Sequence, residues 1–179
     1  MTEEKKEKWL NYLALTTVIF AVCATLSTFK GGGFSTKSVL AQTQASDQWA
    51  YYQAKAIKGY LYELQKDKLE LERKTWGPRL QKPVMEEYEK KIEGYSAKIK
   101  KYDEEKAKIE KDAKKLESMR DDAQKHSKIF GMAVIFLQIA ILLSSIAALL
   151  KKKPVWLLGL ATGSLGILYF INGFFLFMN

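Results

Sequence analysis

The chain has 179 residues, 47% of them hydrophobic, and its 29 basic and 20 acidic residues give a formal net charge of +9. Its apolar residues are gathered in three blocks, at 9–29, 129–150 and 154–178. A single water-soluble core needs apolar residues spread along the chain, so this distribution excludes one. A helix of about 20 apolar residues crosses the hydrocarbon core of a bilayer, and each block meets that length. The sequence therefore predicts three transmembrane helices, with one large polar segment between the first two.

The positive charge is not of the kind that indicates nucleic-acid binding. The only arginines are Arg73, Arg79 and Arg120, whereas direct reading of bases favours arginine. Most lysines instead alternate with acidic residues at helical spacing, as Glu86 and Lys90 do. We therefore expect a solvated helical surface and no nucleic-acid partner. The same charge is compatible with a diffuse attraction to anionic membrane lipid or to anionic envelope polymers.

Residues 1–8 are a charged lead-in to the first apolar block. Lysines followed by an apolar run also begin secretory signals, and Val39-Leu40-Ala41 resembles a cleavage site. However, the apolar run 9–29 is longer than the apolar region of a typical signal and ends well before Ala41. We expect an uncleaved membrane anchor.

Residues 30–36 contain the triplet Gly31-Gly32-Gly33, and we expect a hinge there because glycine loses the most backbone entropy on ordering. A helix is predicted over 37–75. Its predicted seam positions recur at alternating steps of four and three, the spacing of a coiled coil. These positions are Ala50, Ala54, Ile57, Leu61, Leu64, Lys68 and Leu71.

Residues 76–83 form the predicted turn, because proline fits the first turn of a helix but not its interior. The next helix is predicted over 84–128 and shows the same spacing of seam residues. They are Met85, Tyr88, Ile92, Tyr95, Ile99, Tyr102, Ile109, Ala113, Leu116 and Ala123, interrupted by Lys106 and Arg120.

The two predicted helices match in length, at roughly 60 Å or slightly more for a rise of 1.5 Å per residue. Two arms of equal length joined by a short turn indicate an antiparallel coiled-coil hairpin. The expected register sets Leu64 against Tyr95 and Ile57 against Tyr102. The tyrosines at every seventh position are then packing residues rather than a binding site.

No proline separates the helix 84–128 from the second apolar block, 129–150. We therefore predict an all-α membrane protein with three transmembrane helices and a long antiparallel coiled-coil hairpin whose second helix continues into the second span. The basic turn 151–153 leads to the third span, 154–178. Lysines in short loops favour the cytoplasm, which places the N-terminus inside, and the hairpin and C-terminus outside. Lysines beside the spans on the hairpin side weaken that preference.

Several residues in the spans are candidates for helix packing. Gly159 and Gly163 form a small-xxx-small pair that lets helix backbones approach closely, so we expect packing against another span and a contribution to self-association. Asn11, Gln138 and Asn172 are the polar residues expected to hydrogen-bond between spans. None of the three is ionisable, so no proton pathway is indicated.

The sequence contains no pattern typical of an enzyme. Cys23 lies within an apolar block, where a small buried hydrophobe is expected, and His126 sits among lysines, where a solvated histidine is expected. Carboxylates are plentiful, but on a solvated surface nothing raises their pKa for acid–base work. We expect no catalytic residue, no cofactor and no metal site.

The segment 47–58, Asp-Gln-Trp-Ala-Tyr-Tyr-Gln-Ala-Lys-Ala-Ile-Lys, is not required by helix packing alone. With an N-terminal span, a lysine- and glutamate-rich middle and two C-terminal spans, it resembles the bacterial domain-of-unknown-function family 4337. The resemblance implies a bacterial membrane protein with a coiled-coil segment and assigns no activity. The motif residues are candidates for a recognition surface or for contact with a neighbouring subunit. They are Trp49, Tyr52, Gln53, Lys55 and Lys58.

These observations favour a non-enzymatic membrane scaffold or interaction module at the bacterial envelope that self-associates and docks other envelope proteins. Apolar residues off the predicted seam, among them Trp49, Tyr60 and Met119, indicate a further partner for the hairpin. The alternative is an oligomeric pore or transport element whose spans enclose a conduit. An enzyme is the weakest of the three hypotheses.

Overall fold

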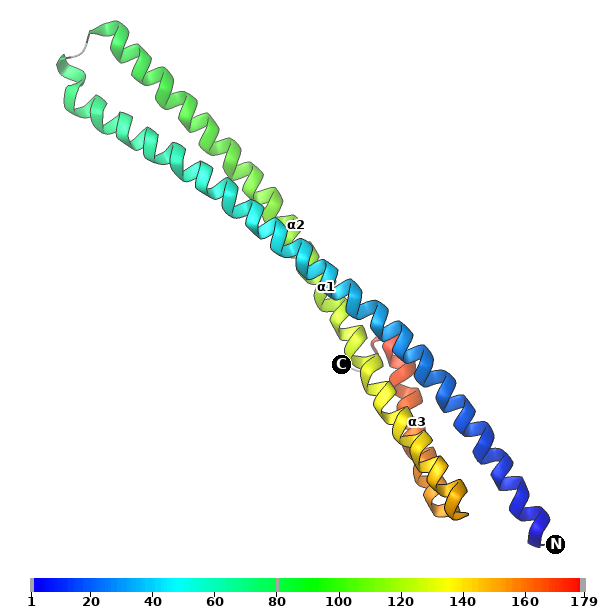
Figure 1. Cartoon of the computed structure of the whole chain (residues 1–179). Helices are drawn as coiled ribbons and strands as arrows, with labels where there is room; N and C mark the ends of the chain where they lie inside the picture. The colour runs from blue at the N-terminus through cyan, green and yellow to red at the C-terminus, as the bar shows by residue number, and fades with distance from the viewer. Residues whose placement is uncertain (1, 80, 178–179) are drawn as a thin grey trace. The chain divides into compact units, whose positions relative to one another are not determined.

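The computed structural model describes residues 2–79 and 81–177. They form three long helices, α1 (Thr2–Trp76), α2 (Lys82–Leu150) and α3 (Lys153–Phe175), with a short 3-10 turn at Gly77–Arg79 (Figure 1). No strand occurs among the described residues. The prediction of an all-α chain is confirmed.

The helices contribute to two compact units. One comprises the chain up to Leu40 and from Met119 onward, and we call it the span unit. The other, Ala41–Ser118, is the polar unit. All three helices are long and apolar enough to cross a membrane, which fits a multi-pass membrane protein.

The glycine triplet does not break the first helix, so the predicted hinge at residues 30–36 is wrong. α1 is continuous from Thr2 to Trp76. Gly31 is a point of close approach, because a Cβ there would lie 3.0 Å from the Phe130 Cβ on α2. The Ser127 hydroxyl also donates to the Gly31 carbonyl at 3.1 Å. Packing against α2 thus holds the backbone that glycine alone leaves free.

The predicted helix ends agree with the proline and glycine positions. α1 ends at Trp76, directly before Gly77, and α2 begins at Lys82 with Pro83 in its first turn. At the basic turn, Lys151 adopts a left-handed φ of 52° and α3 begins at Lys153, one residue earlier than predicted. α3 ends at Phe175, and Met178, where the predicted span ended, lies outside the described residues.

The core of the span unit is built from small residues packed against large ones. Phe20 and Ala24 of α1 meet Ala133, Leu137 and Ala140 of α2 in one cluster. A second cluster joins Trp9, Leu13 and Ala147, with Trp156 of α3 packed against it. Four α3 glycines, Gly159, Gly163, Gly166 and Gly173, are buried.

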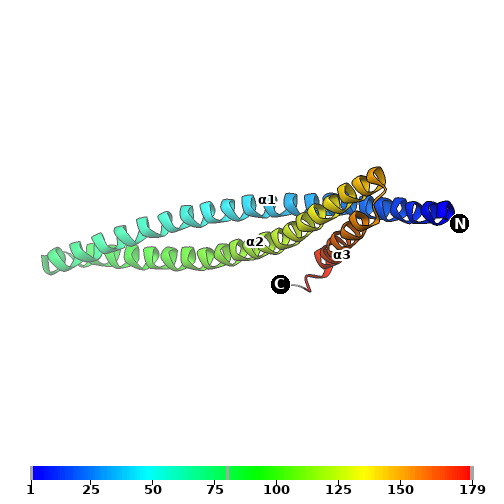
Figure 2. The ribbon, with the colours of Figure 1, turned by 90° about the horizontal axis from the view of Figure 1, so that it is seen from below.

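In the polar unit α1 and α2 run antiparallel and side by side (Figures 1 and 2). Their contacts run in opposite order along the two helices, since Lys55 pairs with Glu105 whereas Tyr62, later in α1, pairs with Lys98, earlier in α2. The predicted face of α2 is confirmed, since its apolar positions from Met85 to Leu116 are buried or half-buried.

The predicted face of α1 is wrong. Ile57 and Leu64 are 59% and 65% exposed, and the other positions of that set are exposed as well. α1 instead turns its small and aromatic residues towards α2, so that Tyr95 and Tyr102 both lie against the ring of Tyr62. The physical reason is space, because buried Ala45, Ala56 and Gly59 leave room for the tyrosines of α2.

Candidate functional site

The motif 47–58 lies on α1 within the polar unit, where every third or fourth residue returns to the same side of the helix. Trp49, Tyr52, Lys55 and Ala56 are half-buried or buried on the side that meets α2. Gln53 and Lys58 are exposed. The helix therefore divides the motif between an internal group and an external one.

Trp49 anchors one end of the internal group. Its indole Nε1 donates a hydrogen bond to the Glu117 carboxylate of α2 at 2.9 Å. Its ring also meets the edge of Tyr52, with centroids 5.5 Å apart. An indole has a single donor that needs a partner when it is removed from water, and Glu117 supplies it.

Lys55 lies at the centre of the group. Its Nζ is 2.7 Å from Glu105 Oε2, and the lysine side chain is only 17% exposed. The ammonium also lies over two tyrosine rings, 5.1 Å from the centroid of Tyr51 and 5.6 Å from that of Tyr102. We name Trp49, Tyr52, Lys55, Tyr102 and Glu105 the Lys55 cluster.

The electrostatics of the Lys55 cluster oppose acid–base chemistry. The close contact of its ammonium with the Glu105 carboxylate, and after it the contact with Tyr51, raises the pKa of Lys55 above its ordinary value. The bond from Lys55 lowers the pKa of Glu105 below its ordinary value. Lys55 therefore stays cationic and Glu105 anionic near neutral pH, which makes a poor base and a poor acid. The cluster is suited to holding α1 and α2 in register.

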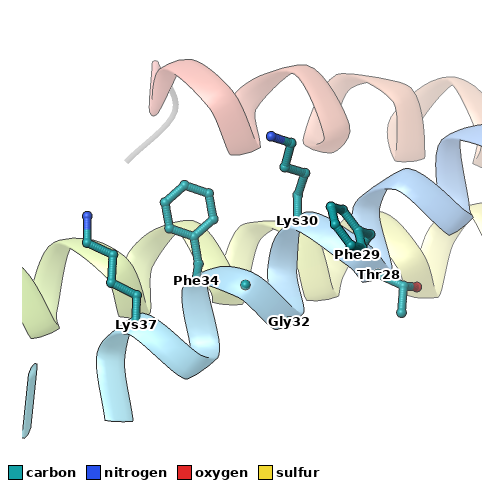
Figure 3. A pocket seen from close by; sticks show the side chains of 7 residues that line it. Thr28, Phe29, Lys30, Gly32, Phe34 and Lys37 are labelled. Atoms are coloured by element: carbon teal, nitrogen blue, oxygen red, sulfur yellow. The ribbon is translucent and has the colours of Figure 1, made fainter. Parts of the chain in front are cut away.

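A second feature is a shallow groove on α1 in the span unit, with a volume of about 590 Å³. Its lining residues all come from one stretch of α1, and most are shown in Figure 3. They are Thr28, Phe29, Lys30, Gly32, Gly33, Phe34 and Lys37. A Cβ on Gly32 or Gly33 would meet nothing within 4 Å, so the groove is open where those side chains are missing.

His126 supports one wall of this groove. Its ring stacks on Phe34 with centroids 4.4 Å apart, and its Nδ1 donates to the Gly173 carbonyl of α3 at 2.7 Å. The side chain is 14% exposed and lies 4.0 Å from Asp122. The expectation of a solvated histidine is wrong, because the ring bridges α1, α2 and α3.

The family match covers the helices that build both features. The model of a family described as a domain of unknown function, DUF4337, matches residues 9–176. The chain belongs to the DUF4337 family. No curated protein and no solved structure matches the chain.

The DUF4337 motif residues singled out from the sequence thus have different positions. Trp49, Tyr52 and Lys55 come together against α2, whereas Gln53 and Lys58 face outward. The five motif residues therefore do not lie on one surface of α1. Their partners Glu105, Glu117 and Tyr102 were missed as a group, although Lys55 and Glu105 stand opposite each other once the antiparallel register is known.

Gly159 and Gly163 lie in the span unit and are filled by the chain itself. A Cβ on Gly159 would lie 3.3 Å from the Ala140 carbonyl oxygen, and one on Gly163 would overlap the ring of Phe20. Packing against another span is confirmed. The expectation that these two glycines contribute to self-association stays a prediction, and within the chain their neighbours come from α1 and α2.

The three polar residues expected to hydrogen-bond between spans differ in burial. Asn172 is buried, at 1% exposure, whereas Asn11 and Gln138 are exposed on the span unit. Among the described residues no group of three metal-binding side chains is found.

Proposed function

We propose that this chain is a non-enzymatic integral membrane protein of the bacterial envelope that forms a homo-oligomeric scaffold. In this proposal the polar unit is an antiparallel coiled-coil hairpin, and copies meet along the exposed positions of α1 that the sequence predicts as its seam. We call those positions the α1 stripe. They are Ala50, Ala54, Ile57, Leu61, Leu64, Lys68 and Leu71.

The exposure of the α1 stripe carries the proposal. α2 occupies the opposite side of α1, where Tyr52, Ala56, Gly59 and Tyr62 lie. The stripe therefore keeps a complete set of seam positions with steps of three and four, and its apolar members are exposed in the part of the chain that the structure describes. A helix with apolar residues on two faces is typically buried on both.

A second copy suits the stripe better than an unrelated protein does. Alternating steps of three and four are the spacing at which two helices interlock as a coiled coil. Identical chains in one membrane associate around an axis normal to it, which brings the same stripe of each copy together. Lys68 is the one charged seam residue, and a polar residue at such a position typically restricts register and copy number.

The test is the mass of the full chain in mild detergent, with helix content checked by circular dichroism. We expect several chains per particle, and we expect Leu61→Glu/Leu64→Glu to reduce the mass to one chain. The control Ala97→Glu/Ala107→Glu adds the same charge at exposed positions of α2 and should leave the mass unchanged. A single-chain mass for the wild type, or an assembly that survives the stripe variant, would contradict the proposal.

Orientation is part of the proposal. We place the N-terminus and the turn at Lys151–Lys153 in the cytoplasm, with the polar unit and the C-terminus outside. Lysines in the short turn support this arrangement. Labelling of intact cells carrying Gln65→Cys in a Cys23→Ser background tests it, because Gln65 is exposed in the polar unit. Labelling only after the inner membrane is permeabilised would invert the topology.

A pore is the second candidate, favoured by the exposure of Asn11 and Gln138 on the span unit. Polar side chains facing lipid are unfavourable, so these two amides suit a face turned to another copy or to water. Conductance of the purified chain in planar bilayers tests the candidate. Current that is lost in Gln138→Leu supports it, and an electrically silent bilayer opposes it.

A further inference from the structure

We propose that the groove at Lys30 and Lys37 binds the phosphate of an anionic phospholipid. The proposal rests on the groove's geometry and on the membrane-spanning character of α1, and it is independent of any oligomer.

The shape of the groove is the first argument. Lys30, Gly33, Phe34 and Lys37 are spaced by three, one and three residues, so they share one side of α1. Lys30, Phe34 and Lys37 project in the same direction in Figure 3. Two lysines seven residues apart stand about 10 Å apart along a helix. Glycine between them leaves the backbone open to a ligand that lies across the helix.

The walls are held in place rather than free. Phe34 stacks on His126 and on Phe130, whose ring centroid is 6.0 Å away. The Nζ of Lys30 lies over the Phe174 ring of α3, 6.0 Å from its centroid. An apolar wall with an ammonium group beside it suits a ligand that is apolar at one end and anionic at the other.

The charge balance is the second argument. No acidic residue occurs between Lys8 and Ser46. Among the described residues neither Lys30 nor Lys37 forms a salt bridge, whereas Lys55, Lys66 and Lys91 each have a carboxylate partner. On α2, Asp121 pairs with Arg120, and a carboxylate oxygen of Asp122 lies 4.0 Å from the His126 ring. The groove is therefore a site of uncompensated positive charge.

The position of the groove along α1 favours a phospholipid as the ligand over a free phosphate ion. Exposed apolar residues continue up to Phe29, which is 76% exposed, and the first charge follows at Lys30. This is where the apolar part of a helix ends, and therefore the level of lipid headgroups. A phospholipid whose phosphate is held between the lysines would have its acyl chains beside Phe29 and Leu26.

The experiment measures lipid adducts on the full chain by native mass spectrometry. Phosphatidylglycerol is compared with phosphatidylcholine, and inorganic phosphate is added as a competitor. We expect phosphatidylglycerol adducts, few phosphatidylcholine adducts and no competition by millimolar phosphate. Lys30→Gln/Lys37→Gln should weaken phosphatidylglycerol binding about 30-fold, from the usual strength of two lysines at an anionic surface. The control Lys151→Gln/Lys152→Gln removes the same charge from exposed positions at the basic turn between α2 and α3.

A second pair of variants tests the groove without changing charge. Gly32→Leu/Gly33→Leu places two apolar side chains in the groove and should also abolish preferential binding, because they take the space of the ligand. A Cβ at either position would meet nothing within 4 Å, so we expect the fold to accept the change. Gly131→Leu is the matched control at an equally open position of α2.

Four outcomes would overturn the proposal. They are equal binding of both lipids, displacement by inorganic phosphate, an equal loss in Lys151→Gln/Lys152→Gln, and retention of binding in Gly32→Leu/Gly33→Leu.

Discussion

The span unit and the polar unit both contain parts of α1 and α2, and the span unit adds α3, but the two units pack their helices by different means. In the span unit glycine meets a large side chain, as Gly166 meets Leu137 and Gly173 meets Phe130. In the polar unit tyrosine rings fill the space, and the Lys55–Glu105 pair and hydrogen bonds join the helices. The hydrophobic effect does not favour association of helices within lipid, so van der Waals contact between closely packed helices must stabilise it. In water the hydrophobic effect does favour association, and water also solvates the ends of half-buried lysines and tyrosines.

The largest loss of stability is expected from a substitution in the span unit. Gly163→Ile should cost about 3 kcal/mol or more, because its Cβ overlaps the Phe20 ring, which is itself in the core cluster. Thermal unfolding of the full chain in detergent measures the loss. Gly131→Ile is the control, since a Cβ there meets nothing within 4 Å. Equal melting of the two variants would mean that close glycine contact does not hold the span unit together.

In the polar unit the largest effect is expected from a buried aliphatic residue. Ile109 is 7% exposed, so Ile109→Ala should cost about 2 kcal/mol or more. Ile57→Ala, at a 59% exposed position of the α1 stripe, should cost no more than about 0.5 kcal/mol in a single chain. Hydrogen exchange of the polar unit's amides in dilute detergent compares them. A larger effect at Ile57 under those conditions would restore the face of α1 predicted from the sequence.

A hydrogen bond should matter less than a buried isoleucine. Trp49→Phe keeps an aromatic ring beside Tyr52 but removes the donor to Glu117. We expect a loss of about 1 kcal/mol, seen as faster hydrogen exchange around residues 45–52. Trp76→Phe is the matched control at an exposed position near the end of α1. Protection that is unchanged in Trp49→Phe would remove Trp49 from the Lys55 cluster as a structural contact.

The smallest expected effect is the pH dependence of the Lys55–Glu105 pair. The pKa of Glu105 is lowered, so its contribution is present above its unfolded pKa and is lost as the pH falls through the folded one. The pKa of Lys55 is raised, so its contribution is present below its unfolded pKa and is lost as the pH rises through the folded one.

The pair should therefore stabilise the polar unit between those two limits, which include neutral pH. Thermal melts of the wild type and of Lys55→Met across acid, neutral and alkaline pH test this. The difference in Tm should be greatest at neutral pH and should shrink towards both ends. A difference that is constant with pH would assign the role of Lys55 to its packing on Tyr51 and Tyr102 alone.

The features that the sequence by itself predicts depend on local chemistry. Proline at Pro83 and Pro154 lies in the first turn of α2 and of α3, where the missing N–H is no loss. The face of α2 follows from one set of apolar residues at coiled-coil spacing, interrupted at Lys106 and Arg120, with no competing set on the same helix. Membrane-spanning length follows from counting apolar residues. The DUF4337 resemblance also came from a contiguous motif, and the family match bears it out.

Only the tertiary structure decides which face of a helix is buried when the sequence offers two comparable faces. α1 carries an aliphatic stripe through Ile57 and Leu64 and a second face of small and aromatic residues, and spacing favours neither. Space for the tyrosines of α2 and the pairing of Lys55 with Glu105 select the second face, and both are contacts between residues far apart in the chain. Gly31 behaves in the same way. A glycine there favours a break in an isolated helix, but α1 stays continuous once Phe130 and Ser127 pack against its backbone.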